Sequence, residues 1–247
     1  MGATLLMSRI GHRTPVNSSK PDWMEESFNG YDEEANKIVR EGIANLLIAQ
    51  PFYGSILLRL RLEQQAIGTF GTNGRVLIYD PRFAKSLTHK QLRGVLAHEA
   101  GHVAGLHPLR KGYRDNHKCW NVSCDHEVNE IVLNRSGFEL PEGTIPPRQG
   151  LAEEFYEEYQ KRKKGSEEDE GDLPEGWCEV GGIELEPGET FEEVEREIKD
   201  IVREAITISQ EAGKVPEGME RIIEEYFSSK LNWDEILRQF ISTHKEP

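Results

Sequence analysis

The chain has few cysteines, and their spacing does not match the common redox or zinc-binding motifs. Its 247 residues include three of them, Cys119, Cys124 and Cys178, and no two stand in the C-x-x-C spacing that redox and zinc-thiolate motifs use. The sequence therefore predicts neither a disulfide framework nor a thiolate zinc site. We expect all three to be reduced structural thiols.

Basic residues and long apolar runs are also scarce. The 44 acidic residues outnumber the 30 basic ones, giving a formal net charge of -14, which repels nucleic acid and anionic membrane surfaces. The apolar stretch at Ile43–Ala49 is too short to cross a bilayer, and no signal segment opens the chain. We therefore expect a soluble, cytoplasmic protein that binds neither nucleic acid nor membranes.

Composition divides the chain into four parts. Residues 1–30 are rich in Gly, Pro, Ser and Asn and predict an N-terminal arm. Residues 31–163 carry the patterns of a folded core, and 189–247 show helical spacing that predicts a C-terminal subdomain. Between them, 164–188 contains a dense acidic run with nothing to bury, which predicts a linker or mobile loop.

Periodicity within the core predicts helices and a small sheet. Apolar residues recur at helical spacing in three stretches, and two shorter stretches alternate with period two around the turn residues Asn73 and Gly74. The expected helices cover 32–50, about 88–103 and 121–134, and the expected strands lie within 55–67 and 75–79. Thr88 has the position of an N-cap for the second helix.

The strongest chemical signal is the run His98-Glu99-Ala100-Gly101-His102. Two histidines four residues apart lie about 40° apart around a helix axis, so both imidazoles can bind one ion from the same face. Glu99 stands where its carboxylate can accept a proton from a water that zinc has acidified. The run predicts half of a zinc site, with His98 and His102 as ligands and Glu99 as the general base.

A third protein ligand is needed, and the sequence offers two candidates. His107 can turn back to the metal only if the helix breaks near Gly105, because a continuing helix would point it about 140° away from His102. Asp125 lies on the next expected helix, with Asn129 one turn later. This arrangement is similar to that of gluzincins, in which a carboxylate on a following helix is the third ligand and a polar residue one turn later orients a ligand histidine. Asp125 is favoured, and His107 stays open as an alternative or additional ligand.

Several segments together resemble the metallopeptidase domain of bacterial proteins that often carry a C-terminal von Willebrand factor A-like domain. The resemblance covers about residues 30–242 and is carried by Thr72-Asn73-Gly74, Leu96 to His102, His107 to Arg110, Trp120 to Asn129 and Leu231 to Phe240. Two departures stand out. The sequence ends where that further domain would begin, and Cys124 occupies a position that is usually small and aliphatic. The resemblance implies a peptidase-type zinc site.

These observations lead to one expectation for fold and function. We expect an α+β, helix-rich, zincin-like fold with a small, mostly antiparallel sheet, and one Zn2+ per chain that serves hydrolysis of a peptide or protein substrate. Residues 71–79 would align the extended substrate through backbone hydrogen bonds. Two alternatives stay open: a zinc-containing binding or regulatory module without catalysis, and a metal-dependent hydrolase of a non-peptide amide.

Overall fold

The computed structural model describes residues 30–112, 114–165, 178–183 and 185–219. The arm expected over 1–30, apart from Gly30, and the helices expected beyond Met219 lie outside these described residues. Within the described ranges, none of the helices has both the length and the apolar composition that crossing a bilayer requires.

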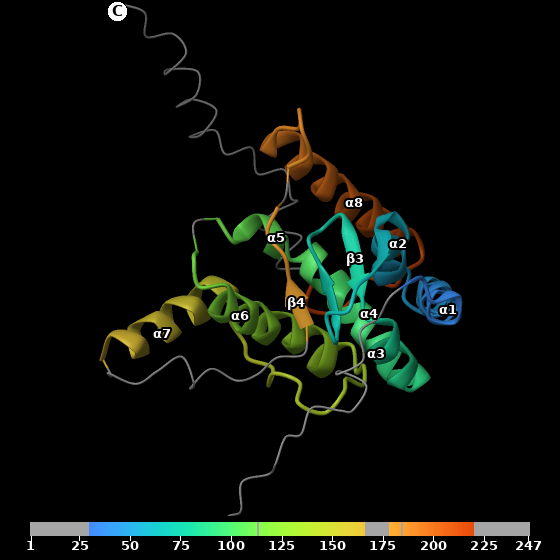
Figure 1. Cartoon of the computed structure of the whole chain (residues 1–247), viewed down its shortest axis with the longest axis horizontal. Helices are drawn as coiled ribbons and strands as arrows, with labels where there is room; N and C mark the ends of the chain where they lie inside the picture. The colour runs from blue at the N-terminus through green and yellow to red at the C-terminus, as the bar shows by residue number, and fades with distance from the viewer. Residues whose placement is uncertain (1–29, 113, 166–177, 184, 220–247) are drawn as a thin grey trace, which may run out of the picture.

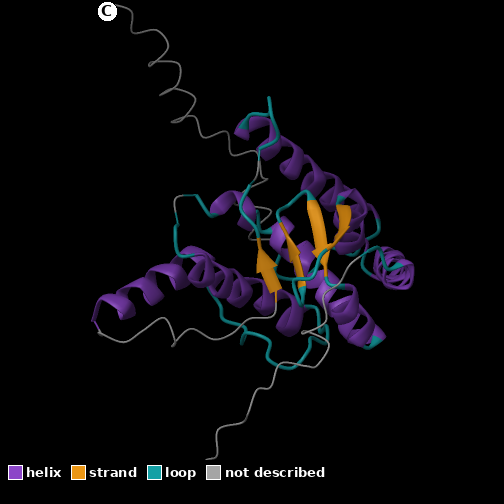
Figure 2. Cartoon of the chain, viewed as in Figure 1, coloured by secondary structure: helices purple, strands orange, loops and turns teal. Residues whose placement is uncertain are grey.

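The fold is helix-rich with one small sheet, which confirms the predicted α+β class (Figures 1 and 2). The longer helices are α1 (Glu33–Ala49), α2 (Pro51–Arg59), α4 (His89–Ala104), α6 (His117–Asn129), α7 (Ala152–Gly165) and α8 (Phe191–Glu211). Shorter elements are α3 (Pro81–Ser86), α5 (His107–Arg110) and the π-helical turn η2 (Glu130–Arg135) that continues α6. The strands are β1 (Arg61–Gln64), β2 (Phe70–Thr72), β3 (Val76–Tyr79) and β4 (Cys178–Val180).

The sheet is mixed, where the sequence predicted a mostly antiparallel one. Its order is β1-β3-β2-β4. The hairpin β2–β3 supplies the antiparallel pairing, and β1 with β3 and β2 with β4 are parallel. Gly74 makes the hairpin turn with φ of 90°, a conformation that side chains with a Cβ rarely adopt. The strand expected over 55–67 is confined to β1.

Residues 51–59 form the helix α2 because the local chemistry favours it over a strand. Pro51 occupies the first turn, where its missing N–H costs nothing. The Ser55 hydroxyl donates to the carbonyls of Pro51 and Phe52, so this buried polar group finds its partners within the helix. Seven of the nine residues of α2 are buried. Apolar residues therefore lie on most sides of this helix, and the sequence shows no helical period of apolar and polar positions.

The main hydrophobic core lies where α1, α2 and α8 pack around α4. Ile198, Val202 and Ala205 of α8 are fully or almost fully buried and belong to the same cluster as Val39 of α1 and Ile56 of α2. The first helix of the expected C-terminal subdomain is therefore part of this core. The strand β4 also joins the sheet, although it lies inside the stretch 164–188 for which the sequence predicts a linker.

Helix α4 begins and ends as the sequence predicts. Thr88 caps its N-terminus in a reciprocal capping box with Gln91, which confirms the expected N-cap. The helix stops at Gly105, and Leu106 takes a left-handed conformation with φ of 55°, which is unfavourable for a side chain with a Cβ. This break turns the chain so that His107 of α5 faces back towards α4.

Helix α6 approaches α4 closely at Gly101. A Cβ at this position would lie 2.8 Å from Cγ1 of Val128, so any larger residue would push the two helices apart. The close approach lets Asp125, on α6, reach the two histidines of α4. The glycine inside the metal-binding run is thus part of what brings the third candidate ligand into place.

Candidate metal centre

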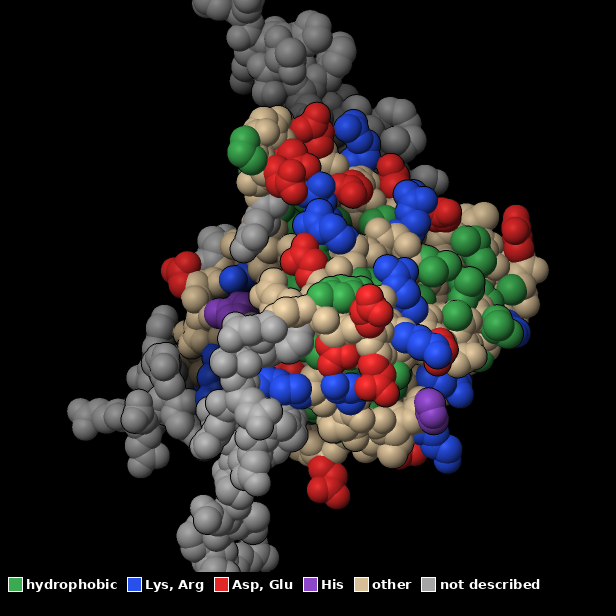
Figure 3. All heavy atoms as spheres, turned by 45° about the vertical axis from the view of Figure 1, so that its right-hand side comes forward, with side chains coloured by type: hydrophobic (Ala, Val, Ile, Leu, Met, Phe, Trp, Pro, Cys, Tyr) green, Lys and Arg blue, Asp and Glu red, His purple; other side chains and the backbone are tan. Residues whose placement is uncertain are grey.

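Four buried side chains from three elements bring their ligand atoms together. His98 and His102 come from α4, Asp125 from α6 and Cys178 from β4, and all four side chains are buried. Each offers one nitrogen, oxygen or sulfur atom, and these atoms lie within 4.8 Å of one another. The outer face shown in Figure 3 carries interspersed acidic and basic side chains, whereas this polar group lies inside the molecule.

The six distances between these atoms fit a four-ligand metal site. The nitrogen and oxygen atoms are 2.8 Å apart for His98 and His102, 3.6 Å for His98 and Asp125, and 3.3 Å for His102 and Asp125. Cys178 Sγ lies 3.0 Å from His98, 3.4 Å from His102 and 3.0 Å from Asp125. Ligands of a tetrahedral zinc at about 2.0–2.3 Å stand roughly 3.3–3.6 Å from each other. Small outward shifts would let all four bind one ion.

The hydrogen-bond network assigns the tautomer of His98. Its Nδ1 lies 2.8 Å from Oδ1 of Asn129, while the amide nitrogen of Asn129 donates to the carbonyl of Ile145 at 2.8 Å. The Ile145 carbonyl needs a donor, so the side-chain nitrogen of Asn129 faces Ile145 and its oxygen faces the imidazole. Nδ1 of His98 therefore carries the proton that this oxygen accepts. In the neutral imidazole with this tautomer, Nε2 of His98 presents a lone pair to the group. This is the orienting role that the sequence predicts for Asn129.

A second chain of contacts assigns His102 in the same way. Its Nδ1 lies 2.9 Å from Nδ1 of His107, whose Nε2 lies 3.3 Å from Oε2 of Glu127. Glu127 is an acceptor paired with Arg110, so His107 donates from Nε2 and accepts at Nδ1. Burial, followed by the nearby charges of His98 and His107, lowers the pKa of His102 to about 3. His102 is thus neutral, with its proton on Nδ1 and a lone pair on Nε2.

With both imidazoles neutral, two nitrogen lone pairs and a carboxylate oxygen of Asp125 converge. Oδ1 of Asp125 lies 3.3 Å from Nε2 of His102 and 3.6 Å from Nε2 of His98. Lone pairs of His98 and His102 that face each other at 2.8 Å repel. A cation between them would remove that repulsion and satisfy the buried carboxylate. The donor set therefore fits a divalent metal, and imidazole, carboxylate and thiolate together suit zinc.

The structure places His107 behind the group rather than in it. The helix does break at Gly105, the condition for His107 to reach the metal, yet His107 turns its Nδ1 to the far nitrogen of His102 and its Nε2 to Glu127. It is not a member of the group of four. Glu127 is itself held by Arg110, which also pairs with Glu153. His107 thus lies in a buried polar network that fixes the orientation of His102.

Glu99 is a buried carboxyl group with no partner among the described residues. Both of its oxygens are shielded from solvent and lack a hydrogen bond there. Burial, and then the nearby carboxylate of Asp125, raises the pKa of Glu99 well above its ordinary value. An unsatisfied buried carboxyl group costs on the order of 1–3 kcal/mol. Its retention beside a metal-type group is typical of a functional acid or base.

Cys178 is the member of the group that the sequence did not predict. It was expected to be a structural thiol, because its spacing from the other cysteines fits no zinc motif. The alternation of Cys178 and Val180 around Glu179 is the only local signal for a buried strand, and it covers three residues after an acidic run. The pairing of β4 with β2 and the hydrogen bonds of β4 to Asn121 of α6 bring this thiol to α4.

Two imidazoles on one helix with a glutamate between them, completed by a carboxylate from a second helix, define a metal-dependent hydrolase. A model of the family described as "Putative metallopeptidase domain" matches residues 35–247, and the chain belongs to that family. No curated protein and no solved structure matches the chain. This is the family that the sequence motifs resemble.

Proposed function

We propose that this chain is a zinc-dependent metallopeptidase with His98, His102 and Asp125 as metal ligands and Glu99 as its general base. The buried carboxyl group of Glu99, which has no hydrogen-bond partner in the part of the chain that the structure describes, carries the proposal. A site that only stabilised the fold would gain nothing from it, whereas a hydrolytic site needs a proton acceptor next to the metal.

Glu99 has the environment that the proton transfers of peptide hydrolysis require. When bound, zinc would supply Lewis acidity to the scissile carbonyl and to the attacking water. A carboxylate oxygen of Glu99 accepts one proton of that water while the water oxygen bonds to the carbonyl carbon. The Glu99 carboxylic acid then donates this proton to the leaving nitrogen as the C–N bond breaks. A raised pKa suits a group that must both accept and return a proton.

We assign His107 and Asn129 as positioning residues, one for each histidine ligand. Asn129 holds Nδ1 of His98 and His107 holds Nδ1 of His102. These contacts keep both Nε2 atoms aimed at the same point and leave their lone pairs free. Asp125 supplies the third ligand because its Oδ1 lies within 3.6 Å of both Nε2 atoms.

One observation favours a second candidate function, a zinc module without catalysis. Cys178 completes a set of four protein ligands, and structural zinc sites are closed in this way, whereas catalytic sites keep one position for water. The two functions differ in what they require of Glu99. Catalysis depends on its carboxylate, whereas a structural site would be unchanged or more stable without this buried charge.

The test is peptide cleavage by the zinc-loaded full chain, with a mixed-sequence peptide library and products identified by mass spectrometry in 18O-labelled water. Because Cys178 completes the group, the wild type and Cys178→Ala are both assayed, each with and without Glu99→Gln. We expect 18O in the new carboxyl groups, and a loss of about 10²–10⁴-fold in rate with Glu99→Gln at unchanged zinc content. A folded, zinc-bound chain that cleaves no peptide in either background would contradict the proposal.

A further inference from the structure

The strand β4 covers the edge of β2 that lies beside the metal group. Phe70 pairs with Cys178 and Thr72 pairs with Val180 in a parallel register. In the sheet order β1-β3-β2-β4, this pairing leaves no free edge on β2. A peptide that is to be aligned by backbone hydrogen bonds needs such an edge. The position next to the metal ligands is already taken by a segment of this chain.

The other edge of β4 is held by a side chain that takes the place of a further strand. The Asn121 amide of α6 donates to the carbonyl of Cys178 at 2.7 Å and accepts from the N–H of Val180 at 2.7 Å. These two backbone groups, two residues apart, lie on the same side of an extended chain and are the ones an adjacent strand would use. Residues 178–180 are therefore held extended between β2 and α6, and Figure 1 shows β4 beside α6.

The thiol of this extended segment takes the position that a catalytic site keeps for water or substrate. Cys178 Sγ lies 3.0 Å from His98 Nε2 and 3.0 Å from Asp125 Oδ1. A metal held by both histidines and Asp125 would have this sulfur as its fourth neighbour. The buried carboxyl group of Glu99, which has no partner among the described residues, is an independent sign that the site is built for a reactant.

We propose that residues 178–180 act as an internal inhibitor: Cys178 is the fourth metal ligand, and β4 occupies the place of an extended peptide substrate. This inference rests on the proposed peptidase function, because it takes a peptide to be the substrate of the site. On metal binding the Cys178 thiol releases its proton to solvent and bonds to the ion as thiolate. Activity then requires that sulfur leave the metal and that residues 178–180 separate from β2. Asn121 positions the segment without belonging to the metal group.

The first test asks whether sulfur binds the metal, and it does not depend on activity. The full chain is loaded with Co2+, which takes the place of zinc, and its near-ultraviolet spectrum is recorded for thiolate-to-cobalt charge transfer. We expect this band in the wild type and in Cys119→Ser, and its loss in Cys178→Ala. The wild-type spectrum needs no variant to fold. Absence of the band from metal-loaded wild type would overturn the proposal.

The second test asks whether β4 blocks access, with acetohydroxamic acid as a small zinc-chelating probe. We expect Cys178→Ala to bind the probe at least about tenfold more tightly than the wild type, because the fourth position is then open. Asn121→Ala should show a smaller gain, since β4 loses one of its two edges while the thiol remains. Cys119→Ser, which removes another buried thiol, should match the wild type. Equal affinity in the wild type and Cys178→Ala would overturn the proposal.

Peptide cleavage by the same variants separates this inference from the proposed function. If Cys178→Ala cleaves peptides at least about tenfold faster than the wild type, both are supported. If the wild type cleaves as fast as Cys178→Ala, the internal inhibitor is overturned and the peptidase stands. If neither cleaves but the cobalt band and the gain in hydroxamate binding are found, the peptidase fails and the closing role of Cys178 is supported.

Discussion

Helix α4 joins two regions whose interiors are built differently. Towards α1, α2 and α8 it packs in a large cluster of apolar side chains. Towards α5, α6 and β4 it buries imidazoles, carboxylates, a guanidinium and a thiol, and most of these groups, though not Glu99, are fixed by a particular partner. Apolar packing depends mainly on shape and volume, so many sequences satisfy it. The polar region depends on individual pairs, and losing one member leaves a buried group unsatisfied.

The largest effect should come from breaking the buried ion network behind His102. Arg110→Ala would leave Glu127, which is 2% exposed, without its cationic partner. We expect a loss of about 3–5 kcal/mol in the free energy of unfolding, measured by urea denaturation of the metal-free protein. Arg148→Ala is the control, because it breaks a half-exposed pair with Glu158 and should cost less than about 1 kcal/mol. Similar losses in both variants would remove the distinction between the two networks.

A core truncation should cost nearly as much stability but leave the metal site intact. Ile56→Ala removes a fully buried side chain of α2 and should cost about 2–5 kcal/mol in urea denaturation. Leu58→Ala is the control in the same helix, because Leu58 is 57% exposed and its truncation should stay within about 0.5 kcal/mol. At urea concentrations too low to unfold them, both variants should bind zinc with the affinity of the wild type. Weaker zinc binding by folded Ile56→Ala would show that the two regions are coupled.

The same contrast explains how far the sequence could predict the structure. Asp125 and Asn129 were predicted because their position on the next helix, one turn apart, is similar to the ligand and orienting residue of gluzincins, and the structure brings both to the histidines. The helix around Ser55 could not be predicted from the sequence, because α2 is buried on most sides and its apolar residues do not recur at helical spacing. Cys178 lies 76 residues from His102 in the chain, and the two meet through the contacts of β4 with β2 and with Asn121 of α6. Local spacing carries no information about such a contact.

The orienting residues should affect zinc affinity more than stability. Asn129→Ala removes the oxygen that fixes Nδ1 of His98 and should weaken zinc binding about 10–100-fold, measured by competition with a chelating dye. His126→Ala is a matched control on the same helix, because His126 is buried but bonds to Pro146 and Tyr159 instead of the metal group. Its zinc affinity should stay at the wild-type value. Equal weakening in both variants would mean that general disruption of α6 is the cause.

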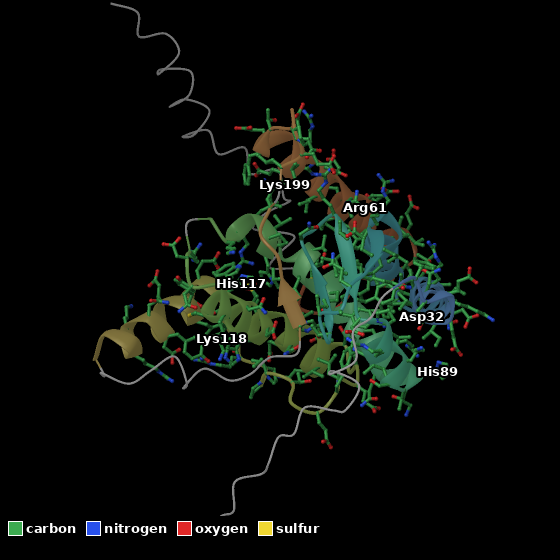
Figure 4. The ribbon with its side chains drawn as sticks, in the orientation of Figure 1. Asp32, Arg61, His89, His117, Lys118 and Lys199 are labelled. Atoms are coloured by element: carbon green, nitrogen blue, oxygen red, sulfur yellow. The ribbon has the colours of Figure 1, made fainter. Side chains whose placement is uncertain are left out.

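The smallest effect tests a polar contact outside the metal region and depends on pH. Asp32, labelled in Figure 4, caps α1 by accepting from the N–H of Ala35 at 2.9 Å, and it pairs with Lys85 at 2.6 Å. The Ala35 N–H and then Lys85 lower the pKa of Asp32 below 3.8. The folded state therefore favours the ionised form, and its stabilising contribution is complete above the unfolded pKa and lost as pH falls through the lower folded pKa.

Asp32→Ala should consequently cost about 1 kcal/mol near neutral pH, and the difference from the wild type should shrink as the pH drops below 3.8. Thr88→Ala is the control, because Thr88 caps α4 together with the uncharged Gln91 and its loss should cost a similar amount at every pH. Urea denaturation of the metal-free proteins between pH 6 and the acid limit of folding measures both. A cost of Asp32→Ala that does not change with pH would show that the cap acts without its charge.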